Sequence, residues 1–532
     1  MTGSIECLPF ELLEKIFTYL PLRDVREAGQ VCHLWNSVLH APRFERQLRI
    51  TLQQDFREPM SDADRNFVAK CRNLTIFQQF HDNSSTSDNE DEETVEAASN
   101  EAEKNIANII FSANDLECLQ LTSRFSNLRC IINSRLMELQ KLKELRISFC
   151  DQPRSGVENT EDAVWLLQND SLESFKIGLA YSISPFDLVA PNLIELHLTI
   201  NCDILLKLVE KFSHQLKHLK TKLTTIEDLD QIMSFNYPRL KHLELAMYDD
   251  KDMHYEYARS ANRTEDDTRA KKFLKQVPGL QSLSLLSHVA LYKICPSLCS
   301  VETTKLEELE FHNMEVDANI LLNVLLVQPV KNLVLQHCEI INDLPGLHIR
   351  MVGLQRLKLI NIINNVLLEH NFCSLKELEL AHGFKYGNDI LLRIFQNFSS
   401  VEHLTLQYRA QLDECAFQRL HQLRYLKSLT IRATEITYEL WQCCNPLVSV
   451  EQLTIIGCFM LPFSMFRGLG RIFPSLKRLN VDNCHIVEDT SGTDGSVDGA
   501  CERKLRAMYP DIVISWHQSE QITPMLLKHM LL

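Results

Sequence analysis

Several patterns that would assign a chemistry to this chain are missing from its sequence. Its 532 residues contain no phosphate-binding loop of the form G-x-x-x-x-G-K-[ST], no G-x-S-x-G nucleophile turn and no H-E-x-x-H zinc motif. No apolar run reaches the ~18 residues that a membrane helix needs, and the opening MTGSIECLPF lacks the layout of a secretory signal. We therefore expect neither an enzyme of these classes nor a membrane protein, and we expect a cytoplasmic or nuclear location.

The charge balance and the cysteine usage also argue against a nucleic-acid surface and a metal site. Lysine and arginine number 55 against 70 acidic residues, a formal net charge of −15, so no nucleic-acid surface is expected. The 17 cysteines form no paired ligands at zinc spacing and no RING-like array with histidine, and an odd count without a signal indicates reduced thiols. The 19 histidines are mostly isolated. We expect no metal, no cofactor and no catalytic residue.

The most informative segment is residues 8–35, LPFELLEKIFTYLPLRDVREAGQVCHLW. Pro9 suits the first position of a helix, and the apolar residues that follow it form one helical stripe, made of Leu12, Leu13, Ile16, Phe17 and Leu20. Pro21 ends that helix, Asp24 can cap a second one, and a third stripe follows at Leu34, Trp35, Val38 and Leu39. Three helices in about 45 residues carry more apolar surface than so small a bundle can hide.

This segment resembles an F-box. The matching residues are Leu8, Pro9, Glu11, Leu12, Leu13, Ile16, Phe17, Leu20, Pro21, Asp24, Val31, Cys32 and Trp35. An F-box docks on the small Skp adaptor of a cullin–RING ubiquitin ligase, so the resemblance implies an adaptor-binding role for Leu8, Pro9, Leu12, Ile16, Phe17, Leu20, Val31, Cys32 and Trp35. The alternative is a helical cap on the next domain, with every apolar residue facing inward.

A second pattern, L-x-x-L-x-L, repeats through the rest of the chain. Its first positions, with conservative replacements, are Leu116, Leu142, Leu172, Leu193, Leu216, Leu240, Leu280, Leu306, Val330, Leu354, Leu375, Val401, Leu426, Val450 and Leu476. Residues 71–76, CRNLTI, fit the same pattern with cysteine in the first position. Most steps measure 21 to 26 residues, and this period and pattern resemble leucine-rich repeats.

The geometry of such a repeat predicts the fold. The pattern places its leucines inward on a short strand and the intervening residues outward. Helical runs at 319–328 and 388–398 lie between strands, and a strand with its helix buries its apolar face only against stacked neighbours. We therefore predict an α/β fold: an N-terminal three-helix F-box followed by a leucine-rich-repeat solenoid (horseshoe) with parallel strands on the concave face.

Composition and pattern divide the chain into five segments. The F-box is expected at 1–50, a linker helix with a first degenerate repeat at 51–80, the solenoid at 105–515, and a C-terminal cap or tail at 516–532. Residues 81–104 form an acidic insert, with nine acids and no base across 82–103, which favours disorder. The polar stretch 249–272 is expected to be a second protruding loop.

One slot of the repeat accounts for several cysteines. Asn201 lies eight residues after the first position of its repeat, and the same slot holds Cys150, Cys338, Cys458 and Cys484. In leucine-rich repeats this slot resembles the buried Asn or Cys position whose side chain supports the turn backbone. We therefore expect these cysteines to be structural.

The fifth position of the pattern points outward from the predicted sheet. In four successive repeats it holds Arg146, Lys176, His197 and Lys220. On parallel strands these side chains would stack about 5 Å apart as a basic ladder, which suits an acidic or phosphorylated target segment. The alternative is that Glu144 and Glu195, in third positions, neutralise the ladder as ordinary surface pairs.

Together these features predict a non-catalytic substrate receptor. The F-box would bind the Skp adaptor and through it the cullin–RING core, while the repeats would hold an unidentified protein target nearby. A leucine-rich-repeat scaffold that works without the ligase is the alternative. Co-purification with the Skp adaptor and a cullin separates the two.

Overall fold

The computed structural model divides the chain into two compact units, Met1–Tyr248 and Asp249–Leu532. The residues it describes are 9–17, 27–39, 49–54, 65, 68–69, 71–78, 101, 104–123, 136–149, 165–178, 186–199, 203–247, 263–286, 294–300, 305–342, 350–362, 371–381, 395–408, 418–433, 444–458, 461–484, 486–487 and 498–517. The acidic insert predicted at 81–104 and the tail predicted at 516–532 fall almost entirely outside them.

The first unit begins with two helices that pack against each other, α1 (Phe10–Phe17) and α3 (His33–Leu39). Helix α1 starts directly after Pro9, whose carbonyl oxygen accepts hydrogen bonds from the amides of Leu12 and Leu13 at 3.0 and 3.1 Å. The buried side chains of the pair are Leu13, Phe17, Val38 and Leu39. Of the second predicted helix only the helical residues 27–28 are described.

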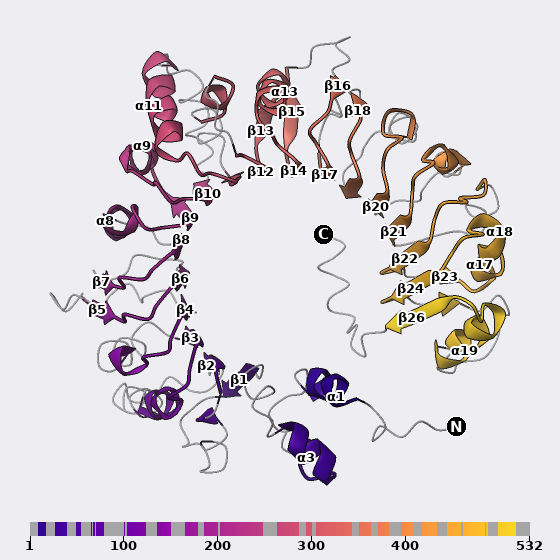
Figure 1. The fold of residues 1–532 in the computed structure, drawn as a ribbon, viewed down its shortest axis with the longest axis horizontal. Helices are drawn as coiled ribbons and strands as arrows, with labels where there is room; N and C mark the ends of the chain where they lie inside the picture. Colours follow the sequence, from indigo (N-terminus) through magenta and orange to yellow (C-terminus); the bar gives the residue numbers. More distant parts are fainter. Residues whose placement is uncertain are drawn as a thin grey trace, which may run out of the picture. The chain divides into compact units, whose positions relative to one another are not determined.

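The first unit continues as a parallel sheet. Its strands pair in the order β1, β2, β3, β4, β6, β8, β9 and β10. Their bounds are Arg49–Gln54, Asn73–Gln78, Cys118–Ser123, Glu144–Phe149, Ser174–Gly178, Glu195–Thr199, His218–Leu223 and His242–Met247. Within this unit the strands line one side and the connecting elements the other (Figure 1), namely η2 (Leu136–Glu138), the pair β5 (Trp165–Gln168) and β7 (Phe186–Val189), α8 (Asp203–Phe212) and α9 (Ile226–Ser234).

The second unit repeats the same plan. Its parallel strands β11, β12, β14, β17, β19, β20, β21, β22, β24 and β26 span Ser282–Leu286, Glu308–His312, Asn332–Gln336, Arg356–Ile360, Glu377–Ala381, His403–Tyr408, Ser428–Ala433, Gln452–Ile456, Arg478–Asp482 and Val513–His517. Short outer strand pairs are β13 (Glu315–Asp317) with β15 (Glu339–Ile341), β16 (Arg350–Met351) with β18 (Asn371–Phe372), and β23 (Leu461–Pro462) with β25 (Ile486–Val487). Its helices include α11 (Arg263–Gln276), α13 (Ala318–Val327), η4 (Leu420–Gln422), α17 (Ser464–Arg467), α18 (Leu469–Ile472) and α19 (Asp498–Met508).

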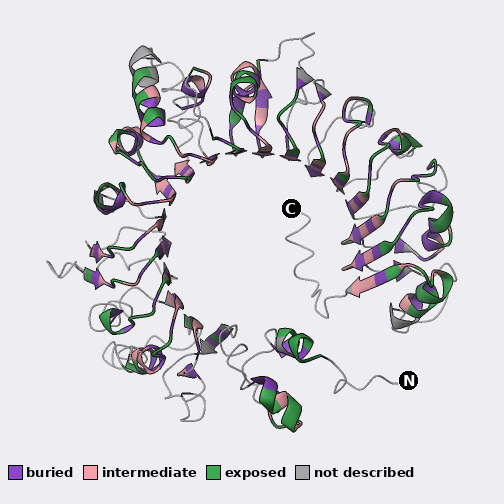
Figure 2. Cartoon of the chain, in the orientation of Figure 1, coloured by how far each residue is buried: buried purple, intermediate pink, exposed green. Residues whose placement is uncertain are grey.

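Each of the fifteen predicted repeats contributes a strand in the expected register. In strand β14, for example, Leu333 and Leu335 are fully buried while Asn332, Val334 and Gln336 are half-buried on the opposite face. The same alternation occurs in β8, β12, β17, β22 and β24, and Figure 2 shows buried residues on the strands of both units. The prediction of stacked parallel repeats with leucines inward is therefore confirmed.

Two strands at the ends of the repeats were not predicted. Strand β1 pairs with β2, and strand β26 pairs with β24. Counting back from the register, their first slots hold Gln47 and Asp511 instead of leucine. A terminal strand has a neighbour on one side only, so its sequence need not carry the full apolar pattern.

The turn after the strand joins neighbouring repeats of the second unit by hydrogen bonds. Seven residues after the first slot, the backbone is left-handed at Asn313, His337, Asn361, Gly457 and Asn483, with φ between 50° and 71°. Glycine, and to a lesser degree asparagine, adopts this region at low cost. The turned amides then donate to the next repeat; that of Asn313, for example, bonds to the carbonyl oxygen of Gln336 at 2.8 Å.

The cysteine slot lies directly after this turn, as predicted. The buried Cys338 places its sulfur 3.3 Å from the carbonyl oxygen of Phe311 in the preceding repeat. Cys458 and Cys484 are also buried, and the amide of Cys458 donates to the sulfur of Cys484 at 3.5 Å. These three cysteines support turn backbone, whereas Cys150 and Asn201 lie outside the described residues.

The connecting elements partly follow the sequence prediction. The helical run predicted at 319–328 is α13, capped by the Asp317 carboxylate, which accepts from the amides of Asn319 and Ile320. The run at 388–398 is described only from residue 395. The loop predicted at 249–272 is wrong in its last part, because residues 263–272 belong to α11. That helix is polar at its start, but Phe273 and Leu274 near its end are fully buried and attach it to the repeats.

Candidate functional site

The N-terminal helices carry several exposed apolar side chains. Five large side chains stand open to solvent there: Phe10 (37%), Leu12 (48%), Ile16 (40%), Val31 (62%) and Leu34 (38%). Figure 2 shows exposed residues on both α1 and α3. Isolated exposed apolar residues are ordinary, but five of them within 25 residues make this segment a candidate binding surface. We call these five residues the docking face.

The docking face follows from the width of the helical stripe. In α1, Leu13 and Phe17 are four residues apart and point into the helix pair, where they are 0% and 1% exposed. Leu12 and Ile16 are also four residues apart, but each lies one residue earlier, about 100° around the helix, and therefore faces outward. Helix α1 thus has two apolar edges. Leu13 and Phe17 pack inside the helix pair, and Leu12 and Ile16 remain exposed.

The predicted adaptor-binding residues divide between this face and the core beneath it. Leu12, Ile16 and Val31 belong to the docking face, and Pro9 is exposed beside them. Phe17 is buried and meets the half-buried Trp35 edge to face, with ring centroids 5.1 Å apart, so Phe17 supports the face from below. Cys32 is half-buried, and Leu8 and Leu20 lie outside the described residues. Their adaptor-binding role stays a prediction.

Two members of the docking face, Phe10 and Leu34, were missed as candidates. Phe10 occupies the variable position between Pro9 and Glu11, and Leu34 precedes Trp35 in another variable position of the motif. Family spacing therefore gave no signal for either residue. Their exposure was decided by how α1 and α3 pack together.

The basic ladder predicted in the first unit is present in register. Arg146, Lys176, His197 and Lys220 lie opposite one another on β4, β6, β8 and β9. The ladder does not stand alone, however, because carboxylates from the third and fifth slots are interleaved with it. The ion pairs are Arg146–Glu144 (2.7 Å), Lys176–Glu144 (3.0 Å), Lys176–Glu195 (3.1 Å), His197–Glu195 (3.1 Å) and Lys220–Glu244 (2.8 Å).

These pairs remove the net charge of the ladder. Three carboxylates face the three permanent cations Arg146, Lys176 and Lys220, so these six side chains together carry no net charge. The hydrogen bond from His197, together with the Lys176 ammonium, holds the pKa of the Glu195 carboxyl well below its usual range despite partial burial. Neutralisation by Glu144 and Glu195, the alternative drawn from the sequence, therefore describes this strip, and target binding by the ladder stays a prediction.

A stacked histidine pair next to the ladder was also missed. The rings of His218 and His242, in neighbouring third slots, lie parallel with centroids 4.4 Å apart. Partial burial lowers the pKa of His218, and the neighbouring His242 lowers it further. The stacked pair lies beside the charged strip, because His218 is on β9 next to Lys220 of the ladder. The aligned slots were visible in the sequence, but the parallel stacking of the rings was not.

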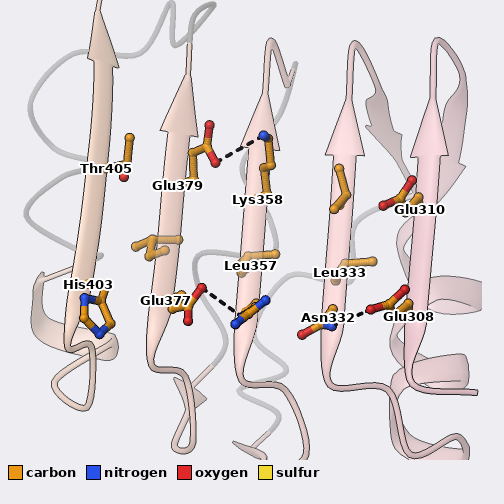
Figure 3. A pocket seen from close by; sticks show the side chains of 13 residues that line it. Glu308, Glu310, Asn332, Leu333, Leu357, Lys358, Glu377, Glu379, His403 and Thr405 are labelled. Atoms are coloured by element: carbon orange, nitrogen blue, oxygen red, sulfur yellow. Dashed lines mark hydrogen bonds and ion pairs between the residues drawn. The ribbon is translucent and has the colours of Figure 1, made fainter. Parts of the chain in front are cut away.

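The outward face of the second unit contains a hollow of about 340 Å³. It extends over β12, β14, β17, β19 and β20 (Figure 3). Its lining includes Val334, an apolar residue in a fifth slot, with Glu310 beside it on β12 and Lys358 beside it on β17. The sequence signal for this hollow was an apolar residue in an outward slot between an acidic and a basic one.

The walls of the hollow differ in charge. On one side, Arg356 and Lys358 pair with Glu377 and Glu379 at 2.9 and 3.2 Å. On the other side, the Glu308 carboxylate accepts a hydrogen bond from the Asn332 amide at 3.0 Å.

Glu310 lies 3.5 Å from the His312 ring, and the hydrogen bond from His312 lowers the pKa of the Glu310 carboxyl, so that this carboxylate is ionised at neutral pH. The hollow therefore has one acidic wall and one wall of neutralised ion pairs (Figure 3).

Within the described ranges, no three histidine, cysteine, aspartate or glutamate side chains are grouped so that they could hold a metal ion. None of the helices that the structure describes is long and apolar enough to cross a membrane.

Comparison with known proteins bears on the N-terminal helices. Residues 5–51 match the family model described as F-box-like. No curated protein matches the chain. Among the solved structures that match is one titled "Crystal structure of Rad7 and Elc1 complex in yeast", 12% identical over 95% of this chain and 92% of that chain, with a TM-score of 0.28. With so low a TM-score, no residue role is transferred from it.

The matched segment contains α1, α3 and the docking face, and it ends within strand β1. The strands that follow have the register and turn chemistry of leucine-rich repeats. The chain therefore combines an N-terminal F-box-like domain with leucine-rich repeats.

Proposed function

We propose that this protein is a non-catalytic target-recognition subunit of a Skp–cullin–F-box-type ubiquitin ligase. The F-box-like helices would dock on the Skp adaptor, and the repeats would hold a protein target. The observation that carries the proposal is the docking face, because its five exposed apolar side chains lie inside the segment that matches the F-box-like family. A cap for the repeats alone would turn these side chains inward.

The contribution of this chain would be proximity. Holding a target beside the ubiquitin-conjugating enzyme raises the effective concentration of its lysines without any chemistry by the receptor. The repeats suit this role because successive strands present their third and fifth slots side by side over many repeats, which offers a surface of protein size. The basic ladder of the first unit remains a candidate for target contact. An acidic target segment would have to displace Glu144 and Glu195 from it.

The decisive test is adaptor affinity with the docking face altered. In the full-length chain, Leu12→Gln together with Val31→Gln should weaken binding to purified Skp adaptor by about 3 kcal/mol, because burying each such side chain contributes roughly 1.5–3 kcal/mol. These positions are chosen because both side chains are already exposed. Trp35→Ala would instead remove the ring that packs on Phe17 and would disturb the helix pair itself.

A matched control makes the same chemical change elsewhere. Met137 and Val352 are 58% and 66% exposed, and both lie outside the F-box-like segment. The double variant Met137→Gln with Val352→Gln should bind the adaptor as the wild type does, when affinity is measured by calorimetry. Equal affinity for the docking-face variant and the control, or no adaptor binding by the wild type, would contradict the proposal and favour a scaffold that works without the ligase.

A further inference from the structure

The acidic wall of the hollow in the second unit differs from the other outward carboxylates. In the described strands, the carboxylates in third and fifth slots are Glu144, Glu195, Glu244, Glu308, Glu310, Glu377 and Glu379. Five of them form ion pairs with lysine or arginine, but within the described part of the chain Glu308 and Glu310 do not. These two are the carboxylates that line the hollow from β12.

The register shows why these two carboxylates lack a lysine or arginine partner. On the β11 side they face Ser282 and Ser284, and on the β14 side they face Asn332 and Val334. Both neighbouring strands are therefore uncharged in these slots. Lysine and arginine first occur in these slots on β17, two strands away at about 5 Å per strand, and there they are paired with β19.

The lining of the hollow also includes an apolar residue in an outward slot. Val334 stands between the acidic wall and the neutralised wall, and its half-buried side chain offers a small apolar surface where the neighbouring fifth slots carry charge. A ligand that fits must therefore place a cation against Glu308 and Glu310 and an apolar group on Val334. An anionic ligand would meet the acidic wall and would find Arg356 and Lys358 already paired.

We propose that this hollow binds an extended segment of a target protein in which a lysine or arginine lies near an apolar residue. This inference rests on the proposed function, since it names the chemistry of the target that the repeats would hold. The hollow spans five strands, roughly 20 Å, which an extended segment of about six residues covers. Residues two apart in such a segment face the same side, so the cation and the apolar group fit positions i and i+2.

The test uses defined peptides in place of the unidentified target. The probes are labelled peptides of about six residues, built of serine and glycine with arginine two positions before valine, and the same peptides with glutamine or glutamate for arginine. In anisotropy titrations of the full-length chain, the arginine peptide should bind roughly tenfold tighter than the glutamine peptide, as expected for two partly exposed charge pairs. The difference should shrink as salt is added.

Variants of the chain locate the effect. Glu308→Gln with Glu310→Gln should abolish the preference for arginine over glutamine. The matched control, Glu307→Gln with Glu451→Gln, also removes two charges, but from exposed pairs with Lys331 and Lys477 outside the hollow, and it should keep the preference. Near-native circular dichroism of both variants confirms that the chain is folded.

The outcomes separate this inference from the proposed function. Equal binding of the arginine and glutamine peptides, no measurable binding of either, or tighter binding of the glutamate peptide overturns the inference, whatever the adaptor does. An arginine preference that survives Glu308→Gln with Glu310→Gln overturns it as well. An arginine preference lost in that variant supports it. Adaptor binding, measured separately through Leu12→Gln with Val31→Gln, decides the proposed function.

Discussion

Replacing Glu195 by glutamine tests whether the charged strip of the first unit stabilises the repeats. The carboxylate lies 3.1 Å from both the Lys176 ammonium and the His197 ring, and the three side chains are only 21–30% exposed. Hydrogen bonds to charged groups contribute about 1.5–3 kcal/mol each. Glutamine keeps a neutral acceptor, and partial exposure screens the charge. We therefore expect Glu195→Gln to lower the free energy of local opening of β6, β8 and β9 by about 2 kcal/mol at pH 7.

The pH dependence of the stability difference provides a second test of this prediction. The pKa of the Glu195 carboxyl is held below its usual range in the folded chain, chiefly by the hydrogen bond from His197. The stabilisation is therefore complete above the carboxyl pKa of the unfolded chain, about 4.3, and it decreases as the pH falls from there toward the lower pKa of the folded state. The difference between wild type and Glu195→Gln should thus shrink below about pH 4.

Native-state hydrogen exchange is the appropriate assay, because two compact units need not unfold as one transition. Exchange of the β6, β8 and β9 amides reports the local opening. The control is Glu307→Gln, which breaks an ion pair with Lys331 whose side chains are 44% and 49% exposed, and it should cost less than about 1 kcal/mol. An equal loss in both variants, or a loss at Glu195 that does not shrink in acid, would refute the reasoning.

Two further predictions concern a turn of the repeats and two of their buried cysteines. Gly457 has φ 71° and no atom within 4 Å of an added Cβ, so Gly457→Asn should leave the thermal midpoint nearly unchanged. Gly457→Val should lower local stability by about 2 kcal/mol, because a β-branched residue is strained in this region. Equal midpoints for the two variants would show that the left-handed turn is not required. Burial raises the pKa of the Cys338 thiol to about 11 and that of Cys71 to about 12, so neither should react with iodoacetamide at about pH 8 until denaturant is added, and mass spectrometry after digestion measures this. Rapid labelling in the folded chain would contradict the structural role of these cysteines.

The site was less predictable than the fold. Family spacing identified Leu12, Ile16 and Val31, which are exposed, but it also included Phe17, which is buried. The docking face depends on how α1 and α3 pack, and a helical stripe alone does not say which of its two edges is used inside. Likewise, the outward slots of the ladder were predictable, because they follow from the period of two along a strand. Their pairing with Glu144, Glu195 and Glu244 depends on which repeats become neighbours and on the rotamers that bring the charges together.

The sequence by itself determined the repeat. An L-x-x-L-x-L pattern with a period near 24 residues can bury its leucines only by stacking parallel strands, so all fifteen strand positions followed from the pattern. The end strands β1 and β26 were decided by the tertiary structure, because a neighbouring repeat offers them a ladder of hydrogen bonds even without a leucine in the first slot. The hollow at Val334 was also decided by the tertiary structure. Its volume and its acidic wall arise from five adjacent strands whose side chains differ in length and charge, and no single repeat contains that information.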